Sequence, residues 1–147
     1  MVDAEDLLTP AHCVSHTLQR TARRVSGIYS EELRACGLGR TQFPLLENLA
    51  VADVGISTTD LARRLDVDRT TLTRILIPLE KAGLVARRSD SRDARVRRVT
   101  ITPAGLSKLQ EGRAAWRRAQ ARTLALIGTD TWRDLETDLR QLRRVLS

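Results

Sequence analysis

Apolar residues recur at helical spacing along most of the chain. In the first part they return every three or four residues between Val14 and Leu33, as expected for a helix with one buried face. Thr9 and Pro10 precede this stretch, and a capping residue followed by proline is typical of a helix start. We therefore predict a first long helix from about Pro10 to Ala35.

Three shorter helices are predicted after the glycine-containing segment 37–39. Thr41 can cap the first of them, because a threonine side chain can accept a hydrogen bond from an N–H group of a first helical turn. Ser57, followed three residues later by Asp60, resembles the capping box of the second. Asp68 can cap the third in the same way.

The third of these helices has one apolar side and one polar side. Its apolar residues lie three or four positions apart and are Leu72, Ile75, Leu76 and Leu79. At 100° per residue, Thr70 and Arg74 lie on the opposite side. The residues that flank this polar side are Thr71, Thr73 and Ile77. Gly83 then ends the helix, since glycine commonly follows the last helical turn.

A β-hairpin and two more helices complete the predicted elements. The segments 84–88 and 96–101 are rich in strand-forming residues, and the sequence SDSRD between them is typical of a turn. Thr102 and Pro103 repeat the cap-and-proline signal and open a helix to about Ile127. After it, apolar residues three and four positions apart predict a last helix with a coiled-coil-like face. These residues are Trp132, Leu135, Leu139, Leu142 and Leu146.

Together the elements predict a mainly α protein with a small β wing. Residues 41–102 form a winged helix-turn-helix lobe, and the segments 10–36 and 103–147 form a helical lobe. With 147 residues, the two lobes constitute a single domain. Because the terminal helices are long and present apolar faces without an obvious partner in the chain, we expect the helical lobe to form a homodimer.

The charge of the chain changes this picture by indicating a partner. It has 25 Lys and Arg residues against 18 Asp and Glu, a net charge of +7, and residues 58–100 contain eleven of the basic and six of the acidic ones. Nearly all the basic residues are arginines, whose guanidinium groups bind phosphates and guanine edges through paired hydrogen bonds. A codon bias toward arginine would explain the composition but not the clustering. Aromatic residues make up 3% of the chain, too few for stacking on single strands, so double-stranded DNA is favoured.

The polar side of the helix after Asp68 provides the candidate base-reading residues. They are Thr70, Thr71, Thr73 and Arg74. Threonine can hydrogen-bond to a base edge or place its methyl group against thymine, and arginine can bind guanine O6 and N7 together. Arg69, at the start of the helix, is expected to bind a phosphate.

The predicted hairpin contains a second set of candidates. Its arginines are Arg92, Arg95, Arg97 and Arg98, with Asp93 near the tip. Such a density of positive charge is repulsive unless an anion lies close by. We expect Arg95 to enter the minor groove, oriented by an ion pair with Asp93, and Arg97 or Arg98 to contact phosphates. The alternative for these last two is an ordinary solvated charge on an edge strand.

Several classes of function are not expected. No apolar run approaches the roughly 20 residues that span a bilayer, and the N-terminus is acidic where a signal peptide would be basic and then apolar. The protein is therefore expected in the cytoplasm, without a membrane partner. Two cysteines do not make a disulfide framework. Because no hydrolase, metalloprotease or nucleotide-binding motif occurs, we expect neither an enzyme nor a cofactor.

Two further hypotheses concern particular residues. His12 and His16 are spaced to share a helix face and could bind a metal, but Cys13 points about 100° away, so packing is favoured and no metal is expected. Cys13 could instead act as a redox sensor. A winged helix used for protein contact alone is the remaining alternative. Such a protein would have a hydrophobic recognition face and would not need basic wing residues. Here the recognition helix has only Ile77 as an apolar residue beside its polar side, and the wing has four arginines.

Three stretches of the sequence carry a family resemblance, and they are TTDLARRLDVDRTTLTRILIPLEKAGLV, Asp93-Ala94-Arg95 and VTITPAG. Because of them, the chain resembles the MarR family of winged-helix regulators along nearly its whole length. The resemblance implies a homodimer that binds a pseudo-palindromic operator, usually as a repressor. It implies release when a small, often aromatic or phenolic, ligand or an oxidant acts near the junction of the lobes. It also implies that Asp93 and Arg95 are the wing-tip acid and the minor-groove arginine, and that Thr70, Thr71 and Arg74 lie on the recognition helix. Some relatives sense peroxide through a cysteine near the start of the first helix, where Cys13 lies.

Overall fold

The computed structural model describes residues 3–52, 54–90 and 96–146. In chain order the elements are η1 (Asp6–Leu8), η2 (Pro10–His12), α1 (Val14–Ala35), α2 (Gln42–Ala50), β1 (Ile56–Ser57), α3 (Thr58–Arg64), α4 (Arg69–Lys81), β2 (Val85–Ser89), β3 (Arg97–Ile101), α5 (Pro103–Ile127) and α6 (Thr129–Val145). Across these described ranges, no helix combines the length and the apolarity needed to cross a membrane.

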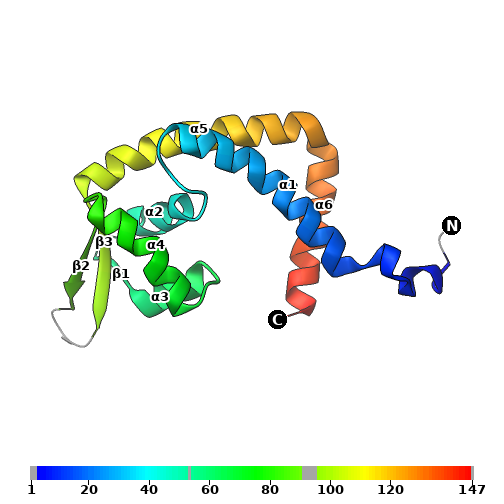
Figure 1. The fold of residues 1–147 in the computed structure, drawn as a ribbon, viewed down its shortest axis with the longest axis horizontal. Helices are drawn as coiled ribbons and strands as arrows, with labels where there is room; N and C mark the ends of the chain where they lie inside the picture. Colours follow the sequence, from blue (N-terminus) through cyan, green and yellow to red (C-terminus); the bar gives the residue numbers. More distant parts are fainter. Residues whose placement is uncertain (1–2, 53, 91–95, 147) are drawn as a thin grey trace.

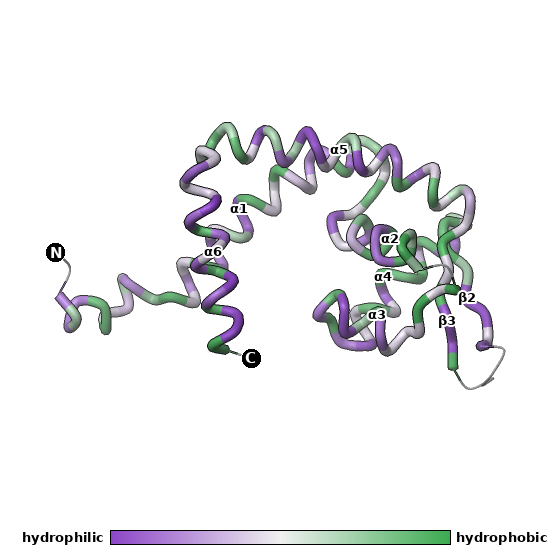
Figure 2. The backbone as a smooth tube through the Cα atoms, turned by 180° about the vertical axis from the view of Figure 1, so that it is seen from behind, coloured by the Kyte–Doolittle hydropathy of each residue, from purple (hydrophilic) through white to green (hydrophobic). Residues whose placement is uncertain are grey.

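The winged helix-turn-helix elements gather at one end of the molecule (Figure 1). From there α5 runs away from this end, α1 packs along it, and α6 turns away where α5 ends. Figure 2 shows hydrophobic and hydrophilic residues alternating along α5 and α6, as expected for helices with one apolar side. The predicted mainly α fold with a small β wing is confirmed.

Buried leucines join the helices of the winged end into one core. Leu46 of α2, Leu61 of α3 and Leu109 of α5 are fully buried, and the α4 residues Leu72 and Leu76 are each 1% exposed. Burying a side chain of this size contributes about 1.5–3 kcal/mol relative to leaving it in water. The apolar side predicted for α4 is therefore confirmed, and it fixes which side of this helix faces solvent.

The sheet has three antiparallel strands in the order β1-β3-β2. β2 and β3 are the predicted hairpin, each starting one residue later than expected. β1 was not predicted, because two residues are too few to show the alternation that indicates a strand. It pairs Ile56 with Val99, so the segment before α3 is joined to the wing by backbone hydrogen bonds.

Three predicted helix caps are confirmed by hydrogen bonds. The side chains of Ser57, Asp68 and Thr102 each accept from the backbone N–H three residues later, at 3.1, 2.7 and 3.0 Å. The cap predicted for Thr41 is wrong, since its side chain makes no such bond. The side-chain oxygen of Gln42 instead accepts from the N–H of Gly39 in the turn before the helix, at 2.8 Å.

The first long helix begins at Val14 and not at Pro10. Residues 10–12 form a 3₁₀ turn, and Cys13 has an extended backbone with φ −61° and ψ 112°. The proline signal therefore marks this short turn, and the α-helix starts after it. His12 and His16 do not share an α-helix, so the helical spacing on which the metal hypothesis depended is wrong.

Gly105 allows the start of α5 to lie against the end of the α4 region. A Cβ atom at this position would lie 2.0 Å from the carbonyl oxygen of Leu84 and 2.7 Å from a side-chain carbon of Ile101. Because the backbone carbonyl cannot move aside alone, we expect Gly105→Ala to lower the free energy of unfolding by at least about 1–3 kcal/mol.

The matched control is Gly27→Ala on α1, where a Cβ would have no heavy atom within 4 Å. Alanine there should stabilise the helix by about 0.5–1 kcal/mol. Urea unfolding of both variants measures the difference, and a Gly105→Ala protein as stable as the wild type would contradict the close approach of the two backbones.

Candidate DNA-binding surface

The solvent side of α4 forms a continuous surface of side chains. Five of them line one shallow depression of about 460 Å³, namely Arg69, Thr70, Thr73, Arg74 and Ile77. All five are exposed, whereas Leu72 and Leu76 on the other side are buried. The structure thus brings four of the predicted DNA-contacting residues of this helix together.

Thr71 differs from the other predicted readers because it belongs to the helix cap. Asp68 accepts from the Thr71 N–H at 2.7 Å and from its hydroxyl at 2.9 Å. The backbone hydrogen bond from Thr71, followed by that from its hydroxyl, holds the pKa of Asp68 below its ordinary value. Thr71 is half-buried, so its hydroxyl hydrogen is used inside the protein and its role as a base reader stays a prediction.

The two other threonines also differ in how free their hydroxyl groups are. Thr73 donates to the carbonyl oxygen of Arg69 at 2.9 Å, which leaves its oxygen to accept a further bond. Within the described part of the chain, the Thr70 hydroxyl has no hydrogen-bond partner, and neither Arg69 nor Arg74 forms an ion pair. This surface therefore has two arginines available for an anion or a guanine edge.

In the wing, Arg97 and Arg98 have different surroundings. Arg97 is exposed, and its guanidinium donates to the Ser89 hydroxyl at 3.0 Å. Arg98 forms an ion pair with Asp90 and donates to the carbonyl oxygen of Gly55 at 3.2 Å. Arg98 therefore ties the hairpin to the turn before β1. Of the two, Arg97 is the better candidate for a phosphate contact.

Three of the predicted wing residues are not among those that the structure describes. Arg92, Asp93 and Arg95 lie outside the described residues, so their predicted roles at the tip stay predictions. The described part of the hairpin closes with a backbone hydrogen bond from Asp90 to Val96 at 2.9 Å. β2 also presents Arg88, which is exposed, and Arg87, which pairs with Glu80 of α4 at 2.8 Å.

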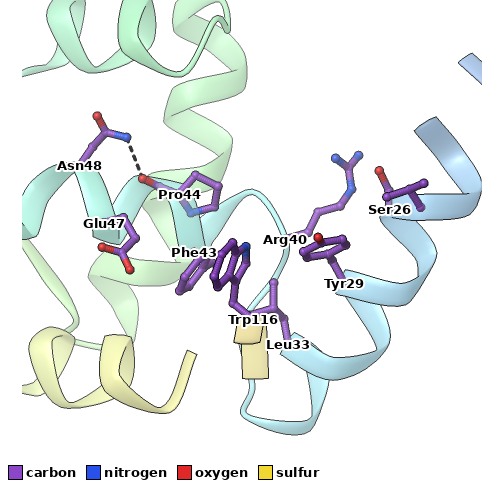
Figure 3. Close-up of a pocket in the computed structure, with 10 residues that line it drawn as sticks. Ser26, Tyr29, Leu33, Arg40, Phe43, Pro44, Glu47, Asn48 and Trp116 are labelled. Atoms are coloured by element: carbon purple, nitrogen blue, oxygen red, sulfur yellow. Dashed lines mark hydrogen bonds between the residues drawn. The ribbon is translucent and has the colours of Figure 1, made fainter. Parts of the chain in front are cut away.

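A pocket between α1, α2 and α5 was not predicted from the sequence. Its volume is about 630 Å³, and the residues that line it are Val25, Ser26, Tyr29, Leu33, Arg40, Phe43, Pro44, Glu47, Asn48 and Trp116. Figure 3 shows the rings of Phe43 and Trp116 lying against each other beside Leu33. Arg40 and Tyr29 lie together on the side of the pocket toward α1. The two aromatic rings are stacked, with centroids 6.4 Å apart and planes at 15°.

Trp116 shows why the sequence did not reveal this pocket. It lies on α5, where a tryptophan is ordinarily expected to pack in a core or a dimer interface. In the structure it stacks on Phe43 of α2 but remains 38% exposed. Trp116 is far in sequence from the other lining residues, which fall between Val25 and Asn48, so no local motif marks the pocket.

Charges around the pocket are unevenly compensated. Glu47 accepts two hydrogen bonds from Arg113 of α5, both at 2.8 Å. The hydrogen bond from Arg113 is the main reason that the pKa of Glu47 lies below its ordinary value. Arg40 forms no ion pair with any described residue. Among the described residues that line the pocket, Arg40 is therefore a guanidinium group not held in an ion pair.

The cysteines do not form a pair. Both are free thiols, Cys13 exposed and Cys36 partly buried, and the Cys36 sulfur donates to the carbonyl oxygen of Leu33 at 3.1 Å. Exposure makes the Cys13 sulfur accessible to oxidants but does not by itself make it reactive. The redox hypothesis for Cys13 stays a prediction.

Comparison with protein families gives a match over the winged part of the chain. The model of the MarR family matches residues 38–96. The HTH-type transcriptional repressor Rv2887 of Mycobacterium tuberculosis is 30% identical over 123 residues, which are 81% of this chain and 88% of that protein. The uncharacterized HTH-type transcriptional regulator YdgJ of Bacillus subtilis is 29% identical over 120 residues, 81% of this chain and 73% of that protein.

Solved structures extend the similarity to about nine tenths of the chain. The M. tuberculosis transcriptional regulator MosR in complex with DNA is 34% identical, with a TM-score of 0.78, over 91% of this chain and 96% of that one. The transcriptional repressor CouR bound to a 23-mer DNA duplex has a TM-score of 0.83 over 93% of this chain and 96% of that one. At 24% identity, this second likeness is one of fold.

The different surroundings of the two wing arginines predict different effects on stability. Arg98→Ala removes the ion pair with Asp90 and the bond to Gly55, and it should lower the free energy of unfolding by about 1 kcal/mol. Arg97→Ala is the matched control on the same strand, with an expected change within about 0.5 kcal/mol. Thermal unfolding at equal salt compares them. Equal losses in both variants would mean that Arg98 does not anchor the hairpin.

Proposed function

The chain belongs to the MarR family of DNA-binding transcriptional regulators, and we propose that it acts as a homodimeric, ligand-responsive repressor on a pseudo-palindromic operator. The observation that supports this most strongly is the solvent side of α4. There, two arginines that form no ion pair with a described residue lie beside two exposed threonines. Such a surface matches the hydrogen-bonding edges and phosphates of a major groove.

Each residue of the reading surface has a proposed role. Arg74 and Thr70 contact base edges, Thr73 offers its free acceptor to the groove, and Arg69 binds a phosphate where the helix begins. Thr71 contributes through the cap that fixes the start of α4.

For the wing we propose contacts on the flank of the same half-site. Arg97 binds a phosphate, and Arg92 adds positive charge near the tip. By the family resemblance, Arg95 enters the minor groove and Asp93 orients it. Arg98 supports these contacts indirectly, because it joins the hairpin to the turn before β1.

The proposed dimer is supported by apolar side chains at the far end of the chain. None of the described residues of α6 is buried, although the helix has a distinct apolar side. Leu126 is 72% exposed, and Leu146 and Val14 are similarly open to solvent. We therefore propose that segments 10–36 and 103–147 form the dimerisation lobe and that residues 41–102 form the DNA-binding lobe. Covering these side chains with a second copy would remove them from water.

Repression follows from where such a dimer would sit. A protein that occupies a promoter operator competes with the transcription machinery for the same DNA, and one relative is named a transcriptional repressor. The alternative of a winged helix used only for protein contact has less support, since the related MosR structure contains DNA. Membership in a family of transcriptional regulators also agrees with the expectation that the chain is not an enzyme.

The pocket beside α2 is the proposed site of the signal. Its stacked rings and Leu33 suit a flat apolar molecule, and Arg40 suits a negative group on that molecule. We therefore propose an anionic aromatic effector. α2 packs against α3, α4 and β3 as well as against α5. A ligand that binds more tightly to one position of α2 would therefore favour one arrangement of the two DNA-binding lobes over others.

Arg74→Ala tests the reading surface. The variant should bind its selected operator more weakly by about 1–3 kcal/mol per contact and should lose preference at one base position in each half-site. Fluorescence anisotropy with single-base operator variants measures both effects. Arg117→Ala removes the same charge from an exposed position on α5 and should keep the base preference. An equal loss on all sequences would make Arg74 a phosphate contact.

Arg40→Ala tests the effector pocket. In the wild type, benzoates should release the operator at lower concentration than the corresponding uncharged benzamides. In the variant, the ratio of the effective benzamide concentration to the effective benzoate concentration should fall about tenfold, which is the effect of one charge-assisted hydrogen bond. Arg34→Ala is the matched control, because Arg34 is close in sequence but does not line this pocket. An unchanged benzoate response in Arg40→Ala would place the effector elsewhere.

A further inference from the structure

One residue of the reading surface has no hydrogen-bonding group. Ile77 is 55% exposed, whereas the leucines of α4 and Ile75 are buried in the core. A β-branched residue also has a lower helix propensity than leucine or alanine. Neither packing within the chain nor helix formation accounts for an isoleucine at this position.

Ile77 lies in line with the residues proposed to contact DNA. Thr73 and Arg74 are one helical turn before it, and it shares their surface depression. From Arg69 to Ile77 the helix advances eight residues, about 12 Å at 1.5 Å per residue, and the major groove is about 12 Å wide. A helix that places Arg69 and Arg74 in or beside the groove therefore places Ile77 there as well.

The next residue extends the apolar character of this end of the surface. Pro78 is also exposed, and it lies inside the helix, where proline has no N–H group. The reading surface is thus charged at its N-terminal end and apolar at its C-terminal end. A groove segment facing the apolar end gains no hydrogen bond from these two side chains.

Among the four base pairs, the major-groove edge has one apolar group, the C5-methyl of thymine. From this we infer that Ile77 contacts a thymine methyl in each half-site and makes that thymine part of the selected operator. The inference rests on the proposed DNA-binding function and adds a specificity-determining residue to it. Contact between the two apolar groups removes both from water.

An exposed isoleucine with no contact to DNA would behave differently in a binding measurement. Single exposed apolar residues are common on protein surfaces, and such a residue would have no effect on base preference. A contact between Ile77 and another protein would also leave base preference unchanged. Dependence on one methyl group of the DNA distinguishes the thymine contact from both.

The experiment uses the full chain and its own selected operator. Duplexes are first selected from a random pool with wild-type protein, and each thymine of the best duplex is then replaced by deoxyuridine, which removes only the methyl group. The wild type, Ile77→Ala and Ile77→Val are titrated against this series. Val51→Ala is the matched control, since Val51 is an exposed β-branched residue outside α4.

At one thymine per half-site, deoxyuridine should weaken wild-type binding by about fourfold, or about 15-fold when both half-sites are changed. Ile77→Ala should bind the two duplexes equally, Ile77→Val should keep part of the difference, and Val51→Ala should keep all of it. A thymine profile of Ile77→Ala identical to that of the wild type overturns the inference and leaves the proposed function standing. Failure of the wild type to select any duplex overturns the proposed function itself.

Discussion

Burial of one side of α4 is the constraint on which the rest of the structure depends. Leu72 and Leu76 lie in the same core as Leu46 of α2 and Leu61 of α3. Turning the helix about its axis would expose these side chains, at a cost of about 1.5–3 kcal/mol for each. The opposite side is therefore held toward solvent, and its arginines and threonines are presented as a fixed surface. A fixed surface loses little conformational entropy when it binds, which favours both affinity and specificity.

The same core connects the reading surface with the rest of the chain. α2 contributes leucines to this core from one side and Phe43, Pro44 and Glu47 to the pocket from another. Glu47 is joined to α5 through both oxygens of its carboxylate. α5 in turn packs along α1 and leads to α6. α5 therefore connects the pocket with the helices that would set the spacing of the two DNA-binding lobes in a dimer. This connection is the physical basis of the proposed ligand response.

The sequence was sufficient where the signal is local. The apolar spacing of α4, the cap formed by Asp68 and the proline start of α5 depend on residues a few positions apart, and the structure confirms them. It was insufficient where distant segments meet. The partners of Arg98 lie 8 and 43 positions away, the pocket takes residues from three helices, and β1 is recognisable only by its pairing with β3. The start of α1 was misplaced because proline at position 10 begins a 3₁₀ turn as readily as an α-helix.

The central claim is that two copies of this chain each place α4 in a major groove of one duplex. A methylation-interference footprint on the selected operator tests it directly, because methyl groups on guanine N7 block contacts in the major groove. Two interfering patches on one face of the duplex, separated by about one helical turn or 10 base pairs, are the predicted result. A single patch, or interference confined to the minor groove, would contradict the claim.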